Sequence, residues 1–410
     1  MIRIWHHRRF TANHTWYVNW AGRELFVKAN PNHNEAMAEC AGHARLRAHY
    51  PVPTLHRATR IPRWTVIVYD RCNHLGPDSG LLLDEITHAD RACDNRRLDD
   101  CLTDVLSHYL SVITGTLRPA TLADTISKLY GDRAAAGGRL DHYYRANAPW
   151  RLAIDGRALH PSDLAALRLV VNGHEHSLDF TGLITWLRGQ FTPDSPVWAA
   201  VTQGDPTDVN IGWSPTAGPI WFDYDTGGLN ALPGEFACFL LYQRFHGAWL
   251  TGAYNSAAFR DHPAALTPAS LREPVVSVDH DPTTLLINYR HTPSPARQHV
   301  LRRYLDEIVY PIAEHVGISD PMEWLRPYLV MRLLAVYNPA LLQPRDTALT
   351  LALLTEALDP SVTLTQFLTL DPHSRKASHQ CPVPSPSSPE PVRASVRPSP
   401  YGWLPDTTCY

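Results

Sequence analysis

Residues 203–225 constrain the fold of this chain more than any other segment. Asp205 and Asn210 lie five residues apart on a loop that the Asp205-Pro206 step makes tight. The residues that follow predict a hairpin with strands at 210–213 and 219–223, joined by a Ser-Pro-Thr-Ala-Gly turn. This hairpin would return Asp223 to the side of Asn210. Carboxylate and amide oxygens, the ligands that Mg²⁺ prefers, would therefore gather in one place.

The first 71 residues predict a strand-rich unit with a single helix. Apolar alternation and turn signals predict strands, and a spacing of three to four residues predicts the helix. The expected strands are 2–10, 16–20, 24–29 and 64–69, and the expected helix is 34–49.

From about residue 80 onward the pattern is mainly helical. The expected helices are 98–114, 119–129, 140–145, 183–191, 235–250, 296–316, 321–337 and 346–358. The Asn172-Gly173 pair within 170–177 predicts a hairpin. Residues 374–410 are rich in proline and serine, a composition that predicts a disordered tail.

Composition excludes several classes of protein. A net charge of −3 over 410 residues gives no sign of a nucleic-acid binder. Seven scattered cysteines without C-x-x-C spacing predict reduced thiols, not a disulfide framework or a zinc site. The amino terminus lacks a signal-peptide pattern, and no apolar run approaches a membrane span. We therefore expect a cytoplasmic protein without a membrane partner.

The run from Gln203-Gly204-Asp205 to Asn210, followed by Asp223-Tyr224-Asp225, resembles the catalytic core of the aminoglycoside phosphotransferase and choline kinase-like families. Their loop reads H-G-D-x-x-x-x-N before a strand that ends in D-[FWY]-[DE]. The resemblance implies an α+β, two-lobed protein-kinase-like fold. Residues 1–71 would form a nucleotide-binding N-lobe, and 72–373 a helical C-lobe with catalytic loop 203–210 and metal-binding strand 219–225. Gln203 departs from the family histidine, whose support of the loop a glutamine can replace by donating and accepting hydrogen bonds.

The resemblance also implies roles for individual residues. Asp205 would orient or deprotonate the acceptor hydroxyl, and Asn210 and Asp223 would hold Mg²⁺ on the phosphates of ATP. Lys28 ends an apolar strand in a chain with only three lysines among 37 basic residues, and would contact the α- and β-phosphates. Glu39 would pair with Lys28, because Leu46 and Pro51 follow it at the family spacing. Asp225 could reach a second metal, and Asp208 could cap the loop.

The function implied is transfer of the γ-phosphate of ATP to a hydroxyl of a small molecule, such as an antibiotic, an amino alcohol or a sugar. Residues 1–71 carry 11 Lys and Arg against 4 Asp and Glu, and the rest carries 26 against 36. That split suits anionic ATP and a neutral or cationic acceptor, although chance asymmetry accounts for it equally well. The alternative function is that of a catalytically inactive kinase-like binding or scaffold protein.

Overall fold

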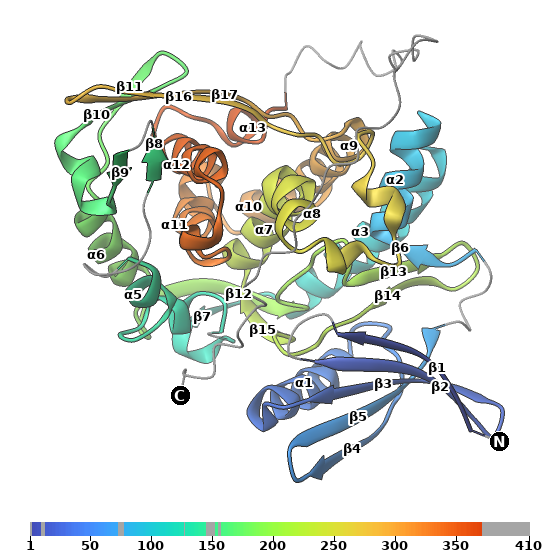
Figure 1. Cartoon of the computed structure of the whole chain (residues 1–410). Coiled ribbons are helices and arrows are strands. Elements are labelled where there is room, and N and C mark those ends of the chain that lie inside the picture. The colour runs from blue at the N-terminus through green and yellow to red at the C-terminus, as the bar shows by residue number, and fades with distance from the viewer. Residues whose placement is uncertain are drawn as a thin grey trace, which may run out of the picture.

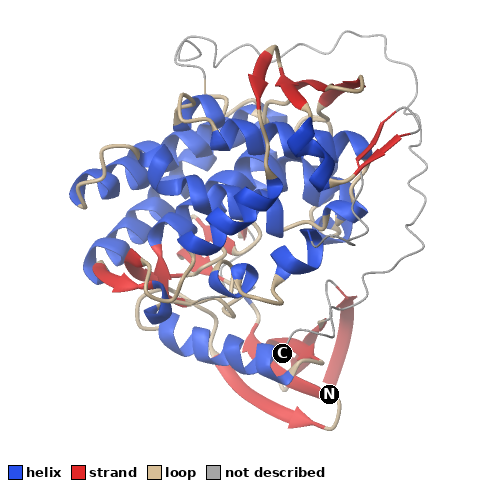
Figure 2. Ribbon diagram, turned by 90° about the vertical axis from the view of Figure 1, so that its left-hand side faces the viewer, coloured by secondary structure: helices blue, strands red, loops and turns tan. Residues whose placement is uncertain are grey.

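The computed structural model describes residues 2–9, 13–72, 78–126, 128–144, 152–154 and 157–370. A strand-rich first lobe lies below a larger helical second lobe (Figure 1). Turned by 90°, the helices gather in one body with the first-lobe sheet at its lower end (Figure 2). The prediction of an α+β fold with two lobes is confirmed. Among the described residues, no helix combines the length and apolar character needed to cross a membrane.

The first lobe is an antiparallel sheet of five strands with one helix packed against it. Its spatial order is β1 (Ile2–Arg9), β2 (His14–Trp20), β3 (Arg23–Asn30), β5 (Trp64–Asp70) and β4 (Leu55–Ile61), and the helix is α1 (His33–Leu46). Alternate residues of β5 are buried, Ile67 and Tyr69 among them, as its apolar alternation predicts. The side chain of Asn32 caps α1 by accepting from the backbone of Asn34 and Glu35.

The second lobe is built around a buried central helix. Every residue of α7 (Leu232–Leu241) is buried, and the helix continues as a π-helical segment, Tyr242–Leu250, and α8 (Thr251–Tyr254). Helix α11 (Pro321–Ala335) packs directly against it. The lobe also contains α2 (Leu82–Ala92), α3 (Arg96–Thr116), α9 (Pro295–Tyr304), α10 (Tyr310–His315) and α12 (Pro344–Leu358). Helices α4 (Gly131–Ala134), α5 (Arg139–Tyr144) and α6 (Phe180–Gln190) precede the loop at 203–210 in the chain, and α5 and α6 lie together on one side of the lobe (Figure 1).

Short sheets position the loop at 203–210. Strand β12 (Pro196–Thr202) leads into that loop and pairs with β15 (Gly228–Ala231) and β7 (Arg118–Thr121). The loop then enters the hairpin of β13 (Ile211–Ser214) and β14 (Gly218–Trp221), on which β6 (Gly80–Leu81) adds a third strand. The predicted hairpin is confirmed, although β14 ends two residues before Asp223.

The observed secondary structure differs from the prediction in several places. Residues 119–129 do not form the expected helix, because residues 118–121 pair with the edge of β12 and 122–124 form one 3-10 turn. Strand β12 itself was not expected. Neither was the hairpin of β16 (Val275–His280) and β17 (Thr284–Arg290), which joins β10 (Arg168–Val171) and β11 (His174–His176) in an outer sheet.

Candidate active site

Lys28 on β3 is bound to a carboxylate of α1. Its Nζ lies 2.7 Å from Oε2 of Glu39, whose side chain is 4% exposed, while the Tyr69 hydroxyl donates to Oε1 of Glu39 at 2.9 Å. Glu39 therefore faces Lys28 from one side and Tyr69 of β5 from the other. Of the two glutamates of α1, Glu39 pairs with Lys28, and Glu35, in the first turn, accepts instead from the Asn30 side chain.

Lys28 also reaches across to the second lobe. Its Nζ lies 3.2 Å from Oδ1 of Asp223, whose side chain is 46% exposed. Burial alone would lower the pKa of Lys28, but the charges of Asp223 and Glu39 raise it above its ordinary value. The Lys28 ammonium in turn lowers the pKa of Asp223. Lysine and aspartate are therefore both charged at neutral pH, and one cation joins carboxylates of both lobes.

Gln203 ties the loop at 203–210 to the segment that carries Asp223. Its side chain is fully buried, and Nε2 donates to the carbonyl oxygens of Phe222 at 2.9 Å and Asp223 at 2.6 Å. Its Oε1 accepts from the backbone N–H of Asp205 at 2.7 Å. A glutamine can make all of these bonds because its amide both donates and accepts. Gln203 thus joins the two segments, which is the supporting role that the resemblance implies for this position.

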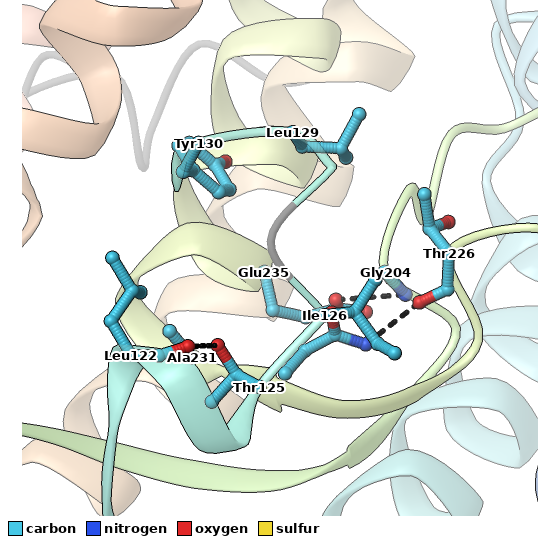
Figure 3. A pocket seen from close by; sticks show the side chains of 10 residues that line it. Leu122, Thr125, Ile126, Leu129, Tyr130, Gly204, Thr226, Ala231 and Glu235 are labelled. Atoms are coloured by element: carbon cyan, nitrogen blue, oxygen red, sulfur yellow. Dashed lines mark hydrogen bonds between the residues drawn. The ribbon is translucent and has the colours of Figure 1, made fainter. Parts of the chain in front are cut away.

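Gly204 has a backbone conformation that suits glycine. Its φ is +90°, and an added Cβ would lie 2.3 Å from the carbonyl oxygen of Thr226. Its N–H donates to Oε2 of Glu235 at 3.0 Å, at the base of the loop (Figure 3). A cavity of about 10 Å³ lies beside Gly204 and Glu235, with room for about one water molecule.

Glu235 is a buried acid that the sequence analysis missed. Besides the Gly204 N–H, it accepts from the hydroxyl of Thr202 at 2.7 Å and from that of Tyr109. Burial raises the pKa of Glu235 to about 7, although these hydrogen bonds oppose the shift. Its carboxyl group holds the entry to the loop in place from α7. An acid on the first turn of an apolar helix is a signal that could have suggested it.

Asp205 lies at the mouth of the loop with its side chain about a third exposed. Its Oδ1 is 3.3 Å from Nη1 of Arg332 and 2.9 Å from the Sγ of Cys238. Arg332 comes from α11, and its side chain is 4% exposed. Nothing in the sequence singles out Arg332 among so many arginines, and the sequence analysis did not name it.

Asn210 closes the loop from its far end. Its side-chain Nδ2 donates to the backbone carbonyl of Asp205 at 2.9 Å. The backbone carbonyl of Asn210 accepts from the Phe222 N–H at 2.9 Å. This arrangement commits the amide nitrogen to the loop and leaves Oδ1 as the atom for another partner. Asp208, by contrast, is fully buried and forms an ion pair with Arg297 at 2.8 Å, so its role is to join the loop to α9.

Asn210 and Asp223 supply the hard oxygen donors that suit Mg²⁺, so the residues present fit that metal. Within the part of the chain that is described, no group of three or more His, Cys, Asp or Glu side chains could hold a metal. A Mg²⁺ ion here would need additional oxygens, and the phosphates of a bound nucleotide would supply them.

Asp225 faces a second lysine. Its carboxylate contacts the ammonium of Lys128, in the stretch between β7 and α4. Burial and the charge of Asp223 raise the pKa of Asp225 to about 6, despite the opposing effect of Lys128. Two of the three lysines of the chain therefore form ion pairs with the Asp223-Tyr224-Asp225 run, Lys28 with Asp223 and Lys128 with Asp225. The scarcity of lysine is the signal that could have pointed to Lys128.

Comparison with known proteins finds similarity in structure alone. No protein-family model matches the sequence, and no curated protein matches it. A glucosamine kinase in complex with glucosamine, ADP and phosphate is similar over 88% of this chain and 94% of its own, at 10% identity and a TM-score of 0.40. An ethanolamine kinase of Plasmodium vivax covers 88% and 82%, at 11% identity and a TM-score of 0.39. An aminoglycoside phosphotransferase covers 81% and 93%, at 12% identity and a TM-score of 0.37.

Proposed function

We propose that this chain is an ATP-dependent phosphotransferase that moves the γ-phosphate of ATP to a hydroxyl group of a small molecule. The observation that carries this proposal is the position of Lys28. Its ammonium lies within 3.2 Å of carboxylates from both lobes, Glu39 and Asp223. Gln203 ties the same Asp223 segment to the loop with Asp205.

Each residue has a separate task in this proposal. Lys28, oriented by Glu39, contacts the nucleotide phosphates as a compact cation. Asn210 and Asp223 hold Mg²⁺, which neutralises charge on the phosphates when it is bound. Asp205 orients the acceptor hydroxyl and accepts its proton at a carboxylate oxygen. The partial exposure of the Asp205 side chain leaves it open to an acceptor.

Turnover tests the proposal directly. Purified protein is mixed with Mg-ATP and a library of hydroxyl compounds, and the release of ADP above the acceptor-free rate is measured. Acceptor-dependent release supports a phosphotransferase. Binding of Mg-ATP without any acceptor-dependent release would favour the inactive kinase-like scaffold instead.

Binding of Mg-ATP tests the metal-binding residues. We expect Mg-ATP to raise the melting temperature of the wild type, and to raise it much less in Asn210→Ala and Asp223→Ala. Asp279→Ala removes an exposed acid on β16 and serves as the control. Equal stabilisation of all four proteins would remove Asn210 and Asp223 from the metal site.

A further inference from the structure

The surroundings of Asp205 contain more positive charge than Asp205 can neutralise. Arg332 is bound to it, and Arg133 of α4 lies close enough to interact with Arg332 and Asp205. Burial, together with the charges of Arg139 and Arg332, lowers the pKa of Arg133 to about 9. Arg332 is therefore paired with Asp205, and Arg133 adds a second positive charge that acts on the same surroundings, where the proposed acceptor hydroxyl would arrive.

Two buried donors in this cluster have no protein partner within the described part of the chain. Among the described residues, none accepts a hydrogen bond from Nη1 of Arg133 or from Nε of Arg332, and both atoms are buried. Arg332 as a residue is 3% exposed. A buried N–H donor without an acceptor is costly, and in folded proteins such a donor is bound by a ligand, a water molecule or an ion.

His246 adds a third polar group from the π-helical segment. It is 2% exposed, and its Nδ1 has no hydrogen-bond partner among the described residues. Burial and the charges of Arg332 and Arg133 lower its pKa well below the ordinary value, so the ring is neutral. A neutral imidazole can still donate one hydrogen bond to an anion.

The acids on neighbouring elements are engaged elsewhere. Asp141 of α5 pairs with Arg188, and Glu235 binds the base of the loop. Asp208, farther along the loop, pairs with Arg297. Beyond Asp205 itself, these carboxylates are not available to bind an amine of an acceptor or to neutralise Arg133 and Arg332.

We propose that the acceptor carries an anionic oxygen group, a carboxylate or a phosphate, which Arg133 and Arg332 bind beside Asp205. This proposal rests on the proposed function and names its substrate class. The planar guanidinium fork matches both kinds of anion through paired hydrogen bonds. It departs from the neutral or cationic acceptor that the overall charge of the second lobe suggests.

Binding of charge-matched compounds tests this inference. Full-length protein with Mg-ADP is titrated calorimetrically with gluconate, glucose 6-phosphate, glucose and glucosamine, and with 4-hydroxybenzoate and 4-hydroxybenzylamine. We expect the acidic member of at least one skeleton to bind, and to bind at least tenfold more tightly than the neutral or amine member. The carboxylate and phosphate arms distinguish the two sources of negative charge.

Substitutions locate the binding site. Arg133→Met and Arg332→Met should each weaken binding of the acidic compound at least tenfold, whereas Arg188→Met, whose guanidinium is paired with Asp141, should not. Arg332 contacts Asp205, so Arg332→Met could weaken binding by moving that side chain. Arg133→Met removes a charge without removing this contact and therefore tests the inference independently. Tighter binding of amines, no binding of any acidic compound, or equal binding by Arg133→Met would each overturn the inference.

Binding of Mg-ADP separates this inference from the proposed function. Retained Mg-ADP binding without anion selectivity would overturn the substrate class alone. If the wild-type protein does not bind Mg-ADP, the proposed phosphotransferase function itself is overturned.

Discussion

At the scale of single residues, an ion pair between two side chains could be predicted only where both residues belong to a known sequence motif. Lys28 pairs with Glu39 as the resemblance implies, and it also contacts Asp223, which no motif predicted. Lys128 and Arg332 reach the site from segments 97 and 127 residues away from their partners, Asp225 and Asp205. Contacts over such distances follow from packing, which local patterns in a single sequence do not encode.

Asp205→Asn should lower turnover roughly 10²–10⁴-fold, because an amide cannot accept the proton of the hydroxyl. Asparagine keeps the shape of the side chain and an oxygen for Arg332, so nucleotide affinity measured by calorimetry should stay near the wild-type value. Asp205→Ala should lose as much activity and some stability, since it leaves Arg332 without its carboxylate. Full turnover in the Asn variant would exclude Asp205 as the proton acceptor.

Glu235 should make stability depend on pH. Its pKa is about 7 in the folded state and 4.5 ordinarily, so the folded state binds the extra proton between these values. The contribution of Glu235 is then fully present below pH 4.5 and is lost as pH rises through about 7, by roughly 3 kcal/mol in total. Urea unfolding at pH 5 and pH 8 should show the wild type losing stability relative to Glu235→Gln. A constant difference between the two proteins would contradict this.

At the scale of elements, strongly periodic segments were predictable and short strands were not. The apolar alternation of β5 and the spacing in α11 are local signals, and both elements form where expected. Strand β7 has only four residues, and it forms because it pairs with β12, a distant part of the chain. Its local sequence does not contain this information, and the pattern was therefore interpreted as the start of a helix. The outer hairpin of β16 and β17 was not predicted, because its segment of the sequence contains none of the motifs on which the prediction was based.

Gly42 sets how closely α1 approaches the Asp223-Tyr224-Asp225 segment, which would hold the metal in the proposed function. An added Cβ would lie 1.7 Å from the carbonyl oxygen of Tyr224, so Gly42→Ala must push α1 away from that backbone. Since Glu39 lies one turn earlier, the variant should bind Mg-ATP at least tenfold more weakly and melt at a lower temperature. Gly115→Ala on α3, where a Cβ meets nothing within 4 Å, should be neutral or stabilise by up to about 1 kcal/mol. Similar behaviour of the two variants in nucleotide binding would refute this role of Gly42.

At the scale of the whole molecule, the change from strand to helix patterns near residue 80 predicted a strand-rich part followed by a helical part, and the family resemblance implied that these form two lobes. The predicted disordered tail at 374–410 lies outside the described residues and stays a prediction. Because its composition offers little surface to bury against an ordering cost of about 1–2 kcal/mol per residue, deletion of 375–410 should leave activity and melting temperature unchanged. Loss of either in the truncated protein would mean that the tail docks onto a lobe, through Tyr401-Gly402-Trp403-Leu404.

Because the chain has few lysines, the candidate active site can be labelled selectively by reagents that react with amines. The chain has three lysines, and two of them, Lys28 and Lys128, contact Asp223 and Asp225. An acyl-phosphate analogue of ATP, which transfers its acyl group to nearby amines, would therefore have almost no competing targets elsewhere on the surface. Peptide mapping of the acylated protein could then measure occupancy of the nucleotide site in a crude extract, before any acceptor is known.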